Sequence, residues 1–221
     1  MKAYWFSDNG KPQFGSTVYE VRDEPYVQGG EIIPCQNGLH ASAEPFDALC
    51  YAWGNTLDIV ELSGTVVHHR DKFAASHRKH IKRIDAGPIL REFARWCALQ
   101  VVDKWECPPV VRQYLETGDE SIREAARDAA DAAAKAASRP IVRNAATDVA
   151  WAAAWSASVA ARTDTARAMA TAKEAAKNAA VAVFPRNAWL SNARYATWYA
   201  TTENQRKKFN EMIEEAFAQA D

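Results

Sequence analysis

The pattern of apolar and polar positions changes character about two-fifths of the way along the chain. Before residue 88, short runs of apolar residues alternate with polar residues at a period of two, which is typical of strands. Turn-forming residues separate these runs. Because the runs are short, we expect a small mixed or antiparallel sheet and not a doubly wound parallel one. The expected strands cover residues 2–7, 16–21, 39–42 and 57–69.

Two local features add detail to this first region. Ser42 followed by Pro45 predicts the start of a short helix, on which Phe46, Leu49 and Cys50 share one face. Gly64 interrupts the run at 57–69 and predicts a bulge or bend in that strand. We therefore expect a compact α+β domain over residues 1–87.

From Pro88 onward the apolar residues recur at the helical period of 3.6. The nine Gly all lie at or before Gly118, whereas 34 Ala follow it, and Ala has the highest helix propensity. Residues 88–118 are expected to form connecting helices, and residues 119–221 an all-α, Ala-rich bundle or solenoid-like array. The predicted helices run from Pro88 to Cys107, from Pro108 to Thr117, over 122–138 and over about 202–218, with others between.

Charge and composition restrict the classes of partner. With 27 basic and 28 acidic side chains the net charge is −1, which disfavours a protein whose main partner is nucleic acid. No run approaches the roughly 18 apolar residues of a membrane span, and the start lacks the apolar stretch of a secretory signal. We therefore expect a cytoplasmic protein with no membrane partner.

The four cysteines lack the C-x-x-C spacing of common zinc motifs, so we expect reduced thiols and no metal. A zinc site built from Cys35, Cys50 and His40 is the alternative.

Large aromatic residues stand out among the alanines of the second region. Two interpretations remain open for them: they fill the gaps between closely packed Ala-rich helices, or they form an exposed surface for a partner, because Trp and Tyr are frequent in binding hot spots. The candidates for a binding surface are Trp151, Trp155, Trp189, Tyr195, Trp198 and Tyr199.

Basic residues and four histidines gather between residues 68 and 83. Such a cluster could bind phosphate or an acidic protein surface. The alternative is a solvated strand and loop. The candidate anion-binding residues are Arg70, Lys72, Arg78, Lys79, Lys82 and Arg83.

The chain contains none of the common nucleotide-binding and hydrolase motifs, namely G-x-G-x-x-G, the P-loop, H-E-x-x-H and G-x-S-x-G. Residues 2–6 (KAYWF), 35–42 (CQNGLHAS) and 60–64 (VELSG), however, resemble an uncharacterised domain family found in phage and prophage proteins. Residues 90–98 and 114–121 resemble the connecting segment that precedes an Ala- and Trp-rich tail in that family.

This resemblance implies a phage or prophage origin and carries no known activity. We expect a non-enzymatic accessory protein that uses no cofactor and binds a host bacterial protein in the host cytoplasm. An inhibitor of an anti-phage defence system, such as an anti-CRISPR protein, fits that expectation, and a homo-oligomer is left open.

A second resemblance points to an enzyme. The order of a strand, Gly15-Ser16-Thr17, residues 38–42 and a helix ending near Tyr51 is similar to the core of ADP-ribosyltransferases. That resemblance implies NAD as cofactor and a site formed by His40, Tyr51 and Glu61, in which Glu61 would stabilise the developing oxocarbenium charge. Phe14 stands where those enzymes usually carry His or Arg, so an active transferase or a degenerate relative is the alternative function.

Overall fold

The computed structural model describes residues 1–137, 154–155, 157–158, 161, 178 and 192–220. The chain divides into two compact units, one formed by Met1–Gly87 together with Phe209–Asp221 and the other by Pro88–Lys208. The first unit contains an antiparallel sheet and the second is helical, so the expected α+β architecture is confirmed.

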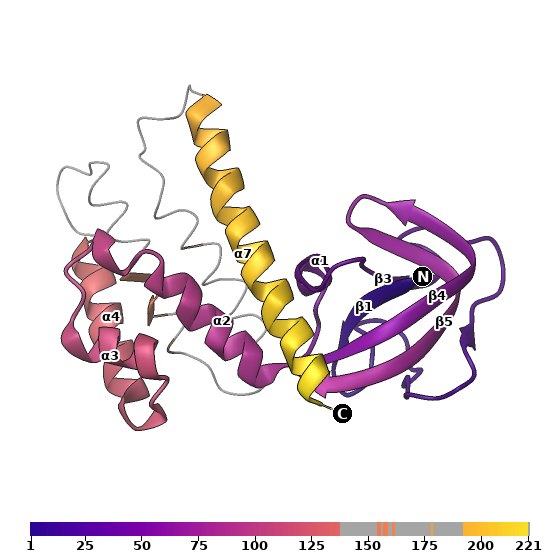
Figure 1. The fold of residues 1–221 in the computed structure, drawn as a ribbon, viewed down its shortest axis with the longest axis horizontal. Coiled ribbons are helices and arrows are strands. Elements are labelled where there is room, and N and C mark those ends of the chain that lie inside the picture. Colours follow the sequence, from indigo (N-terminus) through magenta and orange to yellow (C-terminus); the bar gives the residue numbers. More distant parts are fainter. Residues whose placement is uncertain (138–153, 156, 159–160, 162–177, 179–191, 221) are drawn as a thin grey trace. The chain divides into compact units, whose positions relative to one another are not determined.

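Five strands form the sheet, and all of their pairings are antiparallel. Its order is β1-β4-β5-β2, with β3 also paired to β5. The backbones of Tyr4 and Ser42 exchange hydrogen bonds of 2.8 and 3.0 Å, which join the end of β3 to β1. The strands therefore curl into a small, barrel-like ring (Figure 1). Their bounds are β1 Lys2–Ser7, β2 Tyr26–Val27, β3 Leu39–Ala41, β4 Thr56–His69 and β5 Lys72–Asp85.

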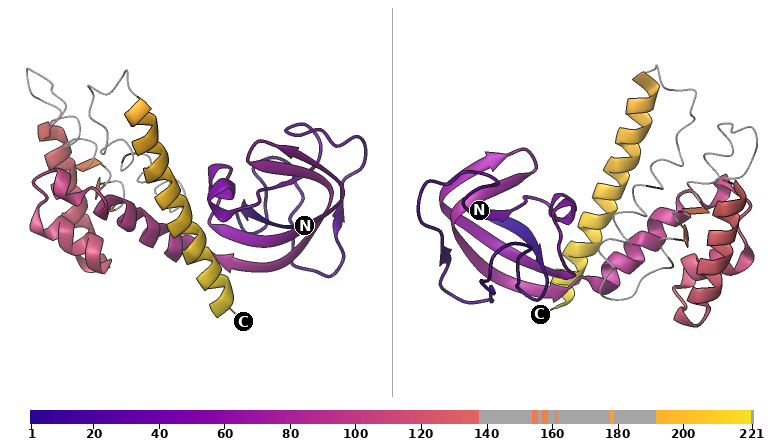
Figure 2. Two further views of the ribbon diagram at one scale, coloured as in Figure 1. Left: turned by 45° about the horizontal axis from the view of Figure 1, so that its top comes forward. Right: turned by 180° about the vertical axis from the view of Figure 1, so that it is seen from behind.

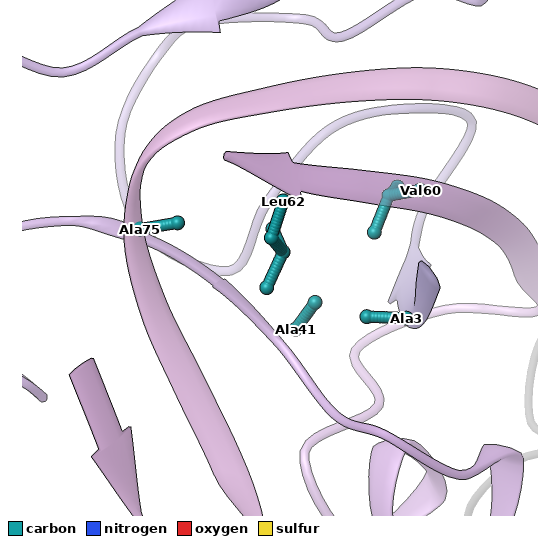
Figure 3. Close-up of a cluster of buried hydrophobic side chains, with 5 residues drawn as sticks. All are labelled: Ala3, Ala41, Val60, Leu62 and Ala75. Atoms are coloured by element: carbon teal, nitrogen blue, oxygen red, sulfur yellow. The ribbon is translucent and has the colours of Figure 1, made fainter. Parts of the chain in front are cut away.

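The interior of this ring is lined by small side chains that four strands contribute (Figure 3). Alternate residues of a strand point to opposite faces, so one residue in two reaches the interior. Three of the five core residues are Ala, which leaves room in a narrow ring for Leu62 and for the rings of Trp5 and Phe73 that pack against the cluster. The core residues are Ala3, Ala41, Val60, Leu62 and Ala75.

The predicted bulge at Gly64 is confirmed by a shift in the register of β4 on β5 between Ser63 and Val66. Gly64 has φ +70°, and an added Cβ would lie 2.4 Å from Nδ1 of His77. Both constraints favour glycine at this position.

Two local expectations about the first unit were wrong. Residues 16–21 form no strand, and the edge of the sheet is β2, which pairs with β5. The short helix α1 (Pro45–Cys50) has Glu44 and not Ser42 at its N-cap, because the backbone of Ser42 is bonded to β1.

The end of the last helix belongs to the first unit. Helix α7 (Asn192–Gln219) begins ten residues before the expected start at 202, and its residues from Phe209 onward are grouped with the sheet. Phe209 lies 6.3 Å from Phe46 of α1, and Phe217 lies 6.5 Å from Tyr4 of β1, measured between ring centroids. Figures 1 and 2 show this end of α7 beside α1.

Hydrogen bonds fix the same contact. The side-chain oxygen of Asn210 accepts from the backbone N–H of Phe46 at 3.0 Å, and its amide group donates to Glu44 at 3.1 Å. Asn210 thereby satisfies a backbone donor in the first turn of α1, where no intrahelical partner exists. Our assignment of residues 119–221 to one helical domain therefore differs from the structure in its last thirteen residues.

The second unit contains helices α2 (Gly87–Leu99), α3 (Pro109–Thr117) and α4 (Arg123–Ala137), with 3-10 turns at Val102–Lys104 and Glu120–Ile122. Helix α2 ends eight residues before the expected end at Cys107. Gly118, at φ +68°, ends α3 in the left-handed conformation common after helices. On α4 the buried residues Ala126, Ala130 and Ala134 recur every four positions, as expected of an Ala-rich packing face.

Candidate functional site

The structure brings two of the three predicted catalytic residues into one neighbourhood. Tyr51 follows α1, and its hydroxyl donates to Oδ1 of Asp71 at 2.5 Å. Nζ of Lys72 lies 4.2 Å from the centroid of the Tyr51 ring. The register of β3 on β5 pairs His40 with Ala74, two residues from Lys72, which places His40 in the same region.

Glu61 lies elsewhere on the sheet. His40 on β3 pairs with Ala74 on β5, which in turn pairs with Val67 on β4. Ala41 and Val60, the strand neighbours of His40 and Glu61, lie together in the interior of the ring, so alternation directs His40 and Glu61 to its outside. Tyr51 contacts Asp71 in the turn between β4 and β5, ten residues along the chain from Glu61.

A backbone group occupies one ring nitrogen of His40. Nε2 accepts from the backbone N–H of Cys35 at 3.1 Å. Burial is the main cause that lowers the pKa of His40, followed by the charges of Lys72 and Arg78. His40 is therefore a neutral imidazole that stabilises the loop before β3.

Tyr51 is held in its protonated form. Burial, the hydrogen bond to Asp71 and the charge of that carboxylate raise the pKa of Tyr51 to about 12. A phenol with so high a pKa is a poor general base at neutral pH.

The four cysteines are free thiols; Cys35 and Cys50 are exposed and Cys97 is buried. Burial raises the pKa of Cys97 well above its usual range. Among the residues that the structure describes, no three His, Cys, Asp or Glu side chains are placed to hold a metal ion. The alternative zinc site of Cys35, Cys50 and His40 thus has no geometric support.

Arg78, which we expected in an anion-binding cluster, is instead buried inside the first unit at 2% exposure. Its guanidinium lies between two aromatic rings, 4.2 Å from the centroid of Trp5 and 4.4 Å from that of Tyr19. Nε donates to Nε2 of His80 at 3.1 Å, and Nη1 donates to the carbonyl of His40 at 2.6 Å. Burial lowers the pKa of Arg78 to about 10. This arginine stabilises the core and is not available to a dissolved anion.

Arg83 is likewise engaged, in a buried ion pair with Asp58. Its Nε and Nη2 donate to the two carboxylate oxygens at 2.7 Å each. Oδ2 of Asp58 also lies 2.5 Å from Nδ1 of His80, and both of these residues are fully buried. Because Arg78 donates to Nε2 of His80, the ring proton must reside on Nδ1, and His80 is neutral.

The pKa directions agree with this assignment. Burial alone would raise the pKa of Asp58, but the hydrogen bonds from Arg83 and His80 outweigh it and lower the value. Burial lowers the pKa of His80, against the opposing effect of Asp58. The sequence carried a signal for this network, because Asp58 shares a strand face with Val60 and Leu62, and an isolated carboxylate on an apolar face requires a partner.

The four remaining basic candidates lie at separate places. Nζ of Lys82 donates to the carbonyl of Phe217 at 2.7 Å, so its charge stabilises the C-terminal end of α7. Lys79 pairs with Asp23 at 3.5 Å, Lys72 lies on the ring of Tyr51, and Arg70 is exposed in the turn between β4 and β5. The expected single anion-binding cluster is therefore not formed, because alternation along β5 and the hairpin turn direct these side chains apart.

The aromatic candidates of the second region are only partly described. Trp155 is half-buried. Tyr195, Trp198 and Tyr199 lie on α7, and their side chains fall outside the described part, as do Trp151 and Trp189 altogether.

The sheet edge carries an apolar surface that our strand prediction missed. In residues 14–31, here called the edge segment, four large apolar side chains are exposed: Phe14 at 83%, Val27 at 66%, Val18 at 52% and Val21 at 46%. Strand β2 within this segment is the last in the strand order.

The backbone of the edge segment is nevertheless held in place from Tyr19 to Gln28. The N–H of Gln28 donates to the carbonyl of Ser76 at 2.8 Å, and the carbonyl of Tyr19 accepts from Arg83 at 2.8 Å. The Tyr19 ring stacks on His80, with centroids 5.4 Å apart. Inward contacts of Tyr19 thus hold the segment in place while the neighbouring valines face solvent.

The strands of the sheet unit lie within a stretch of the chain that matches a sequence-family model. Residues 1–92 match the model of a domain of unknown function, DUF7666. The matched range contains all five strands, so an uncharacterised domain family covers the N-terminal part of the chain. No curated protein and no solved structure matches the chain. No helix in the described part is both long and apolar enough to cross a membrane.

Proposed function

We propose that this protein is a binding protein that holds a partner protein through its edge segment. In this proposal it is a phage- or prophage-encoded accessory protein, and the partner is a bacterial host protein in the cytoplasm, such as a component of an anti-phage defence system. The observation that carries the proposal is the exposure of four large apolar side chains within the fourteen residues from Phe14 to Val27. Clustered exposed apolar residues mark interaction sites more often than isolated ones.

The energetics favour Phe14 as the anchor of this contact. Full burial of a Phe or Val side chain contributes about 1.5–3 kcal/mol, and Phe14 is both the largest and the most exposed of the four. Hydrogen bonds to β5 already hold the backbone at Arg22 and Gln28, so this part of the segment loses little conformational entropy when a partner binds.

The enzymatic alternative has no comparable support from geometry. His40 and Glu61 face the outside of the ring, Nε2 of His40 accepts from the backbone of Cys35, and Tyr51 keeps its proton. We therefore base the proposal on binding and invoke no NAD chemistry.

The test is capture of partners from bacterial lysate by the full-length protein, with quantitative mass spectrometry as readout. The double variant Phe14→Ser/Val27→Ser should lose the captured host protein while keeping the melting temperature of the unaltered chain. Val66→Ser is the matched control, because Val66 is an exposed valine of the same unit outside the edge segment. Equal capture by the double variant and the unaltered protein would refute the proposal.

A further inference from the structure

The edge segment carries charge almost entirely of one sign. Between Phe14 and Glu31 the sequence has four acidic residues and a single basic residue, Arg22. All four carboxylates are exposed, and that of Asp23 is 99% accessible. The acidic residues are Glu20, Asp23, Glu24 and Glu31.

The one basic side chain of the segment forms no ion pair with these acids. The guanidinium of Arg22 lies 3.6 Å from the centroid of the Tyr26 ring and donates to the backbone carbonyls of Glu24 and Pro25. Of these four acids, only Asp23 has an ion-pair partner in the described part of the chain, Lys79 at 3.5 Å. The carboxylates of Glu20, Glu24 and Glu31 form no ion pair with described residues.

Carboxylates and exposed apolar side chains are interleaved along the segment. Glu20 directly precedes Val21, and Asp23 follows it by two positions, whereas Tyr19 points inward. A partner side chain that packs on Val21 must therefore approach negative charge. Complementary charge around an apolar contact determines which partners are accepted, and like charge repels the others.

We propose that the edge segment selects a partner segment in which apolar side chains are flanked by Lys or Arg. This inference rests on the proposed function and specifies the chemistry of its partner. The negative charge of the surface also opposes nucleic acid and anionic lipid as occupants.

The test uses two synthetic peptides as probes, identical in their apolar residues but carrying Lys in one and Glu in the other at the polar positions. Binding to the full-length protein is followed by fluorescence anisotropy at low and at physiological salt. The Lys peptide should bind about tenfold more tightly than the Glu peptide, and the difference should shrink as salt is added.

Charge-reversal variants test whether the peptide preference arises from the carboxylates of the edge segment. Glu20→Lys/Glu24→Lys/Glu31→Lys should reverse the preference between the two peptides. Glu116→Lys/Glu214→Lys/Glu215→Lys changes the net charge equally at exposed positions outside the edge segment and should retain the original preference. Melting temperatures establish that both triple variants remain folded.

The outcomes separate this inference from the proposed function. Equal affinity for the two peptides, or an equal effect of both triple variants, would overturn the inference. If Phe14→Ser/Val27→Ser loses the captured host protein but the peptides show no preference, the inference fails and the proposed function stands. If the peptide preference holds but capture is unaffected by the double variant, the proposed function fails.

Discussion

Replacing Phe209 by Ala tests whether the end of α7 is part of the folded core of the sheet unit. Phe209 is fully buried and packs edge-on against Phe46 of α1. It lies on the same helix face as Ile213 and Phe217, which are also buried. The substitution removes the ring and leaves the helix backbone intact.

The expected loss follows from three contributions. Transfer of the side chain contributes about 1.5–3 kcal/mol, the aromatic pair adds about 0.5–1.5 kcal/mol, and the remaining cavity brings the cost to about 3–5 kcal/mol. Domains of this kind have total stabilities of about 5–15 kcal/mol. The substitution should therefore remove a large fraction of the stability of the sheet unit.

Hydrogen exchange measured by mass spectrometry is the appropriate assay, because it localises the effect. Peptides covering β1 and β4 should exchange about a hundredfold faster or more in Phe209→Ala, since each 1.4 kcal/mol corresponds to tenfold. Glu214→Ala, at an exposed position of the same helix, should change stability by less than about 0.5 kcal/mol. Faster exchange confined to α7, with β1 and β4 unchanged, would refute our assignment of this helix end to the core.

Three further predictions concern the ionisable groups of the sheet unit. Asp58→Asn should cost about 3–5 kcal/mol in urea unfolding, because it leaves buried positive charge unpaired, whereas the exposed Asp23→Asn should cost less than about 0.5 kcal/mol. Burial lowers the pKa of both His80 and His40 below 6.5, so the unfolded chain binds protons that the folded chain does not. The melting temperature should therefore fall as pH decreases below 6.5, and a constant value down to pH 5 would contradict this. Ultraviolet titration should show one tyrosine that ionises near pH 12 and is missing in Tyr51→Phe; loss of a step near pH 10 instead would contradict the raised pKa.

Elements defined by local signals were predictable. The aromatic-rich run at Lys2–Ser7 is strand β1, the helix expected at Pro45 is α1, and Gly118 ends α3. Each depends on residues within a few positions of one another, through propensity, capping or backbone conformation. No partner from elsewhere in the chain is needed to recognise them.

The strand predicted at residues 16–21 is absent from the structure. Alternation of apolar and polar residues shows only that a segment is able to form a strand. A strand also requires a neighbour, and β5 pairs at this edge with Tyr26–Val27. Val18 and Val21 are consequently exposed, although their pattern is typical of a half-buried strand. The placement of His40 and Glu61 also depends on tertiary structure, because their neighbours Ala41 and Val60 fill the interior of the ring and direct both side chains outward.

By itself, the sequence determined the α+β class, the change from sheet to helix near residue 88, and the positions of several element ends. Only the tertiary structure decided that Arg78 is enclosed between Trp5 and Tyr19, and that the backbone N–H of Phe46 donates to the side chain of Asn210, 164 residues away. The physical reason is that periodicity and capping act within a few residues. Burial and charge pairing depend on which distant segments pack together, and the local sequence pattern does not specify that packing.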